Sequence, residues 1–249
     1  MKKRLLIIKQ MEKEDKKLEN LEKFLGIAFK EKSWLIQALT HRSYLNEVKS
    51  KELKSNERLE FLGDAILSFW ISSEIFKRFP DFPEGQLTFI RTYLVRTETL
   101  AGLAKKLALG KYLYMSRGEE LSGGRENPSL LANTFEALIG AIFIDQGLKS
   151  ASDFLRKQFF PLLEGIKNVE SLKDSKSLFQ EIVQAQGYPS PVYKLHSAEG
   201  PDHQKIFTMG VYINEKLIAE GTSRSKQEAE EEAAKKALEI FKKEKDLKI

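Results

Sequence analysis

The stretch SNERLEFLGDAILSFW, Ser55 to Trp70, decides the first half of the fold. Its apolar residues recur at helical intervals, and Glu57, Glu60 and Asp64 stand among them. Because these acids are separated by three and four residues, they share one face of a helix. Burying an ionised carboxylate is costly unless a partner compensates for it. The stretch therefore predicts a helix whose acidic face meets basic side chains or a divalent cation.

A second apolar segment, NTFEALIGAIFID at 133–145, also carries polar oxygens on one helical face. Packing the two faces together would form one pocket, lined by Glu57, Glu60, Asp64, Asn133 and Glu136. Carboxylate and amide oxygens are the ligands that Mg²⁺ or Mn²⁺ prefers, and the absence of His and Cys from both segments disfavours zinc. A solvated acidic helix face is the alternative, and the residues alone leave both possibilities open.

The composition is that of a globular protein: 249 residues, of which 41% are hydrophobic and 31% charged, with a net charge of +5 and no cysteine. Disulfides and thiolate zinc sites are therefore excluded. The N-terminal apolar run LLII is too short for a signal peptide. No stretch is expected to span a bilayer, so we expect a cytoplasmic protein without a membrane partner.

Two domains are predicted. Residues 1–166 show helical periodicity and predict an all-α domain, and the polar segment 167–173 is a candidate linker. Residues 174–249 predict a small α+β domain of order α-β-β-β-α, with a hairpin turn at Asn214-Glu215 and an Ala-rich last helix. This second domain carries 12 Lys and Arg against 13 Asp and Glu, so any binding to a polyanion requires a local basic patch.

Several motifs resemble those of the bacterial ribonuclease III family. They occur in the family's order: THRSY at 40–44, NERLEFLGDAIL at 56–67, EGQLT at 84–88 and LANTFEALIGAIFID at 131–145. The tail, 175–241, resembles a double-stranded-RNA-binding domain through SLFQEIVQ, GPDHQKIF and GTSRSKQEAEEEAAKKAL. The expected fold is thus an all-α endonuclease domain, which also dimerises, followed by this RNA-binding domain.

The resemblance implies a homodimeric, Mg²⁺-dependent endoribonuclease, with Mn²⁺ as a substitute ion. Such an enzyme cuts double-stranded RNA in a staggered manner, leaves 5′-phosphate and 3′-hydroxyl ends, and processes ribosomal RNA precursors and other structured transcripts. Carried onto this chain, Asp64 and Glu136 are the catalytic acids, and Glu60 and Asn133 complete the metal ligands. Glu57 and Glu84 match further acids near the cleft or the subunit contact.

Asn133 departs from the family pattern, which usually has Asp at this position. An amide oxygen still coordinates a divalent ion but brings no negative charge. One alternative is therefore a catalytically weak or silent double-stranded-RNA-binding dimer. A second is a metal-dependent hydrolase of small phosphate esters whose tail binds proteins, although the chain has no Gly-rich loop to cradle a nucleotide.

For the tail, the resemblance implies an RNA-binding surface built from three short elements. Its expected contacts are Gln180, Glu181, His203, Arg224, Ser225, Lys226 and Gln227. The last four open a helix, whose free N–H groups and dipole favour phosphate. The glutamates at 228 and 230–232 are expected to form a solvated face directed away from RNA. His41 is expected to be a helix-end or packing residue rather than a catalytic one.

Overall fold

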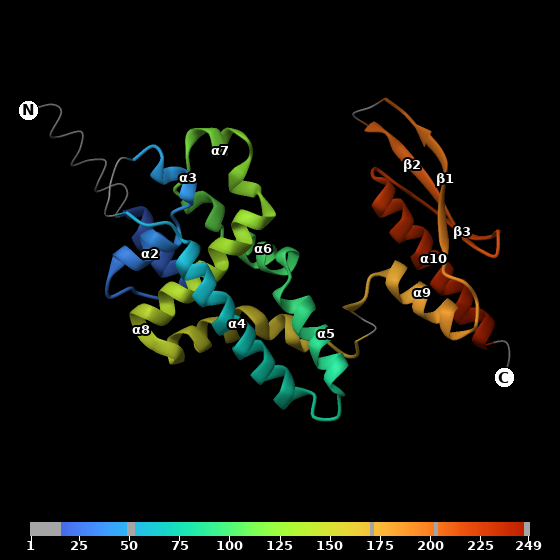
Figure 1. Cartoon of the computed structure of the whole chain (residues 1–249), viewed down its shortest axis with the longest axis horizontal. Helices are drawn as coiled ribbons and strands as arrows, with labels where there is room; N and C mark the ends of the chain where they lie inside the picture. The colour runs from blue at the N-terminus through green and yellow to red at the C-terminus, as the bar shows by residue number, and fades with distance from the viewer. Residues whose placement is uncertain (1–15, 49–52, 170–171, 202–203, 247–249) are drawn as a thin grey trace, which may run out of the picture. The chain divides into compact units, whose positions relative to one another are not determined.

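The computed structural model describes residues 16–48, 53–169, 172–201 and 204–246. These residues form two compact units, which divide between Lys167 and Asn168. The first is helical and the second is a three-stranded sheet covered by two helices, so the predicted fold classes are confirmed (Figure 1). The predicted linker at 167–173 is described only in part, because residues 170 and 171 lie outside the described ranges.

The first unit is built around two long helices, α4 and α8. Residues 16–25 are helical. The labelled helices that follow are α2 (Lys32–Ala38), α3 (Arg42–Leu45), α4 (Glu57–Arg78), α5 (Glu84–Val95), α6 (Thr97–Lys106), α7 (Arg117–Leu121) and α8 (Pro128–Glu164). Helices α4 and α8 lie side by side through the middle of the unit, and α6 and α2 also pack on α8 (Figure 1). The acidic stretch that opened the sequence analysis therefore lies on a central element.

The core of the first unit lies between α4, α6 and α8. Its largest buried side chains include Leu67, Ile71, Phe135, Leu138 and Phe159. Trp70 is also buried and lies 6.1 Å from Phe159, measured between ring centroids. Burying a side chain of this size contributes about 1.5–3 kcal/mol, so the α4–α8 contact is a main source of stability for the unit.

Helix α8 spans 128–164, but its backbone is not helical at Gly147, so it consists of two helices joined at a kink. Asn127 caps its start by accepting hydrogen bonds from the N–H groups of Ser129 and Leu130, and Pro128 occupies the first helical position. Gly147, with φ of 81°, forms the kink between the two helices.

The expectation that no stretch could span a bilayer is wrong in one respect. Among the residues described, α8 is long enough and apolar enough by length and composition. More than half of its most apolar window is buried within the unit, as in a core helix.

The second unit contains α9 (Ser175–Ala185), β1 (Val192–Glu199), β2 (Ile206–Ile213), β3 (Lys216–Ser223) and α10 (Lys226–Asp246). The sheet is antiparallel in the order β1-β2-β3. Asn214 and Glu215 both have positive φ, 48° and 64°, as a two-residue hairpin turn requires. The predicted turn is thus confirmed.

The core of the second unit lies between its two helices and one face of the sheet. Phe179 and Val183 of α9 pack with Val211 of β2 and with the alanine face of α10. Five small or apolar residues that recur at helical spacing form this face, and all are buried: Ala229, Ala233, Ala234, Ala237 and Leu238. Small side chains are needed here because a Cβ on Gly221 of β3 would lie 2.2 Å from the Ala229 carbonyl oxygen. Helix α10 therefore packs close to the sheet.

Candidate active site

A cavity of about 600 Å³ opens where α4 meets the first half of α8. Both predicted oxygen-bearing faces line it, with Glu57, Glu60 and Asp64 from α4 and Asn133 and Glu136 from α8. Glu60, Asn133 and Glu136 are half-buried, whereas Glu57 and Asp64 are exposed. The structure therefore brings together all five residues that the sequence placed in one pocket.

Two glycines let the helices that carry these acids approach closely. A Cβ on Gly63 would lie 1.8 Å from the Glu136 carbonyl oxygen, and a Cβ on Gly140 would lie 2.2 Å from the Leu59 carbonyl oxygen. Real Cβ atoms do not make such contacts, so any larger residue would push the helices apart. Gly63 stands beside Asp64 in the sequence, but only the structure shows that Gly140 of α8 lies against it.

The acids of the cavity raise one another's proton affinity. Burial, with the charges of Asp64 and Glu60, raises the pKa of Glu136 to about 7. The pKa of Glu60 is also raised, by burial and then by the charges of Glu57 and Asp64. In the described part of the chain, no ion pair offsets the charge on Glu60, Asp64 or Glu136. The negative charge of these three acids is therefore not offset by any ion pair in the described residues.

The chemistry of these side chains fits a hard divalent cation, since four carboxylates and the amide oxygen of Asn133 line a cavity with room for water. Among the residues described, no three His, Asp or Glu side chains are already grouped as a metal site. Because like charges repel, the carboxylates would have to close around an ion on binding. Glu60, Asp64, Asn133 and Glu136 are the side chains that would hold it.

The rest of the cavity lining combines basic and polar side chains with two apolar ones. His41 and Arg42, at the start of α3, and Asn56, just before α4, line it together with the acids. Arg42 Nη1 lies 3.7 Å from Glu57 Oε1, and both side chains are largely exposed. An ion pair so exposed contributes little to stability. The expectation that His41 caps a helix is confirmed, but the sequence did not indicate that it borders the cavity.

Glu84 is not part of this cavity. It begins α5, is exposed, and accepts a hydrogen bond of 2.8 Å from Thr88 Oγ1. Glu84 therefore does not lie near the cavity of its own chain, because α5 follows the C-terminal end of α4 and the cavity lies at the N-terminal end. Its role at a subunit contact stays a prediction.

In the second unit, Gln180 and Glu181 are exposed on α9, and Glu181 pairs with Lys173. At the other helix, Arg224, Lys226 and Gln227 are exposed, and Ser225 caps α10 by accepting a 3.2 Å hydrogen bond from the Glu228 N–H. The Lys226 ammonium lies 5.9 Å from the Phe207 ring centroid. His203, the remaining predicted RNA contact, lies outside the described residues.

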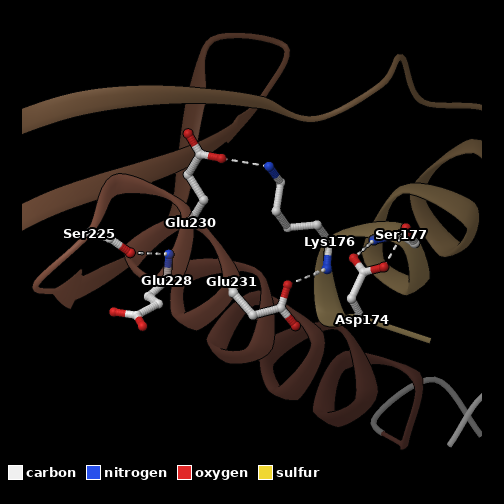
Figure 2. A network of polar contacts seen from close by, with 7 residues as sticks. All are labelled: Asp174, Lys176, Ser177, Ser225, Glu228, Glu230 and Glu231. Atoms are coloured by element: carbon white, nitrogen blue, oxygen red, sulfur yellow. Dashed lines mark hydrogen bonds and ion pairs between the residues drawn. The ribbon is translucent and has the colours of Figure 1, made fainter. Parts of the chain in front are cut away.

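The expectation of a solvated glutamate face on α10 is wrong. Glu231 accepts hydrogen bonds from the N–H groups of Ser175 and Lys176 at the start of α9, and Glu230 pairs with the Lys176 ammonium (Figure 2). Glu232 accepts a 2.8 Å hydrogen bond from the Thr222 N–H. These acids join α10 to α9 and β3, because the unpaired N–H groups of a helix start attract a carboxylate.

The same contacts place the start of α9 beside the first two turns of α10 (Figure 2). The predicted RNA contacts on α9 and on the start of α10 therefore belong to neighbouring elements. Several acids of the second unit are hydrogen-bonded or paired within the unit. A net charge of −1 for this unit is therefore compatible with a local basic patch at Arg224 and Lys226.

The comparisons with known proteins agree with this two-unit organisation. Residues 31–163, just over half of the chain, match a family model described as ribonuclease-III-like. Residues 175–240 match the double-stranded RNA binding motif. The fold and the site thus define a helical nuclease-type unit joined to an RNA-binding motif. The chain belongs to the ribonuclease III family and is an enzyme of the ribonuclease III type.

Similar proteins match over most of their length. Ribonuclease 3 of Carboxydothermus hydrogenoformans is 47% identical over 238 residues, covering 95% of this chain and all of the relative. Ribonuclease 3 of Pelotomaculum thermopropionicum is 45% identical, covering 89% of this chain and 92% of the relative. A solved nuclease domain of ribonuclease III from Campylobacter jejuni, described as flexible in a region involved in dimer formation, is 40% identical. It covers 57% of this chain and 98% of that domain, with a TM-score of 0.52.

Proposed function

We propose that this protein is a divalent-metal-dependent endoribonuclease that cleaves double-stranded RNA as a homodimer. Its expected products carry 5′-phosphate and 3′-hydroxyl ends from staggered cuts, and its expected substrates are ribosomal RNA precursors and other structured transcripts in the cytoplasm. Mg²⁺ is the expected ion, with Mn²⁺ as substitute. The observation that carries the proposal is the cavity between α4 and α8, where Glu60, Asp64 and Glu136 stand without a cationic partner in the described residues.

Hydrolysis forms a bond from water oxygen to phosphorus and breaks the bond from phosphorus to the 3′-oxygen, which takes up a proton. A bound divalent ion would supply a more acidic water and offset the charge on the phosphate. Glu60, Asp64 and Glu136 would hold this ion in the cavity. Burial and the charges of Asp64 and Glu60 raise the pKa of Glu136 to about 7, so a bound cation would favour its ionised form.

The rigidity of the site comes from the helices rather than from loops. The glycine contacts fix the spacing between Asp64 and Glu136, because neither helix can move closer and a larger residue would separate them. Side chains held on packed helices are positioned more accurately than side chains on loops. This accuracy matters because small displacements of the reacting groups cost large factors in rate.

Asn133 supports a second candidate function, that of a weak or silent nuclease that binds duplex RNA. Its amide lines the cavity at a position where an acid would add charge. We favour an active enzyme because the other three acids are in place. A cleavage assay decides between the two: duplex binding without products, with cutting restored by Asn133→Asp, favours the silent form.

A homodimer is supported by an exposed apolar stripe on α4. Phe61, Phe69 and Phe76 are 80%, 60% and 70% exposed, and each lies about two helical turns from the next. Exposed aromatic rows of this kind are typical of association surfaces. Two antiparallel RNA strands are cut by two clefts when two copies pair about a two-fold axis.

The test is cleavage of a long RNA duplex with Mg²⁺, with single-stranded RNA and EDTA as controls. We expect staggered duplex products only when both duplex and ion are present. Glu136→Gln should remove cleavage and keep duplex binding. Turnover of mononucleotides without cutting of duplex would overturn the proposal. Deleting 174–249 should weaken binding at moderate salt and leave some cutting at low salt, since phosphate contacts are salt-sensitive.

A further inference from the structure

His41 is held by one edge of its ring. The Ser43 N–H donates to His41 Nδ1 at 3.4 Å, and Ser43 Oγ lies 2.8 Å from the same nitrogen. Ser43 Oγ itself accepts a 3.0 Å hydrogen bond from the Ser116 N–H. The Ser43 hydroxyl keeps its proton for donation to Nδ1 when this nitrogen is unprotonated. The loop before α7 and the start of α3 thus fix the orientation of the ring.

These bonds favour one tautomer of the ring. A backbone N–H can only donate, so its contact with Nδ1 favours the neutral imidazole that carries its hydrogen on Nε2. In the part of the chain that the structure describes, Nε2 has no hydrogen-bond partner. The ring is half-buried, and His41 belongs to the lining of the cavity.

A phosphodiester that enters this cavity approaches four carboxylates, which repel its charge. Among the described lining, the side chains that can donate from nitrogen are His41, Arg42 and the amides of Asn56 and Asn133. Arg42 is exposed and is paired with Glu57. A fixed N–H donor would orient the phosphate relative to the acids.

Resting on the proposed function, we propose that His41 is a substrate-contacting residue whose Nε2–H donates to a backbone phosphate oxygen of the RNA. In this role the neutral imidazole acts as a hydrogen-bond donor and transfers no proton. Ser43 acts as a positioning residue, because it holds Nδ1 as an acceptor and so keeps the hydrogen on Nε2. The cavity then combines acids that would hold the cation with a donor that binds the RNA phosphate.

The simpler explanation is that His41 only caps α3, and two substitutions separate the two roles. His41→Asn keeps a side-chain acceptor for the Ser43 N–H, since Asn is among the best capping residues, but removes the distal donor. His41→Gln has a longer side chain that keeps a distal N–H donor but loses the short capping acceptor. Each variant therefore serves as the matched control for the other.

The experiment compares single-turnover cleavage of duplex RNA with urea unfolding of the same full-length variants. We expect His41→Asn to unfold like the wild type and to cleave about 10- to 100-fold more slowly, the usual effect of losing a hydrogen bond to a charged group. His41→Gln should be the less stable variant and yet cleave within about threefold of the wild type.

The outcomes separate the two proposals. A wild-type protein that fails to cut duplex RNA with Mg²⁺ overturns the proposed function. If the wild type cuts and His41→Asn cuts equally fast, the role of His41 in contacting RNA is overturned. Equal losses of cleavage in both variants overturn it as well, because the cap would then be what matters.

Discussion

Glu136→Gln should make the metal-free protein more stable while it removes cleavage. The pKa of Glu136 is about 7 in the folded protein, against an ordinary value of 4.5. Ionised Glu136 is therefore disfavoured by folding. The cost is small below pH 4.5, grows as the pH rises towards 7, and is constant above that. Gln keeps the size of the side chain and never ionises.

The magnitude follows from the difference between the two pKa values. One pKa unit corresponds to about 1.4 kcal/mol, which gives an upper limit of about 3 kcal/mol at pH 8. Glu136 is half-buried, so solvent screens part of this cost. We expect the free energy of unfolding of Glu136→Gln to exceed that of the wild type by about 1–2 kcal/mol at pH 8 in EDTA, and by less than half as much at pH 5.

Tryptophan fluorescence during urea unfolding measures this difference in the full chain. Both tryptophans, Trp34 and Trp70, lie in the first unit, so the signal is not mixed with unfolding of the second. Glu164→Gln, at the exposed end of the same helix, is the control and should stay within about 0.5 kcal/mol of the wild type. Added Mg²⁺ should stabilise the wild type more than Glu136→Gln. A variant no more stable than the wild type at pH 8, or a gain that does not depend on pH, would refute the reasoning.

Three further predictions concern other parts of the molecule. Phe61→Asp should raise the dissociation constant of the homodimer at least tenfold in sedimentation experiments, which is about the loss of one buried aromatic contact. Phe24→Asp is the control, because Phe24 is also exposed but lies outside α4, and it should leave the dissociation constant unchanged. Equal effects of the two variants would exclude the stripe as the contact. Asn133→Asp should bind Mn²⁺ more tightly by calorimetry and lower the stability in EDTA, since it adds a charge to the cavity; unchanged affinity would place Asn133 outside the ligand set. Glu231→Ala should speed amide hydrogen exchange at the start of α9 by about fivefold or more, because the Ser175 N–H loses a charged acceptor. Exchange as slow as in the wild type would show that Glu231 does not stabilise the start of α9.

Local signals were sufficient for most of the fold. The helical spacing of apolar residues located α4 and most of α8, and alternation with a two-residue turn located the β2–β3 hairpin. The alanine face of α10 was also predictable, because five small or apolar residues recur at helical spacing. Such features depend on residues close in sequence, where the period of the pattern follows the geometry of the backbone.

The use of exposed and polar residues was less predictable. Phe61, Phe69 and Trp70 look alike in the sequence, yet Trp70 is core and the two phenylalanines are exposed. The glutamates of α10 look like a solvated face, yet Glu230 and Glu231 bind the start of α9 (Figure 2). A helical pattern shows which residues share a face, but the partner that meets the face comes from a distant segment.

The sequence by itself determined the two acidic helix faces, the order of the two units and the family to which the chain belongs. Only the tertiary structure decided that these faces line one cavity, that Gly63 and Gly140 set their spacing, and that His41 lines the same cavity. The reason is physical. Periodicity is a property of the local backbone, whereas the distance between two helices depends on which side chains are absent at their contact, and those belong to residues far apart in the chain.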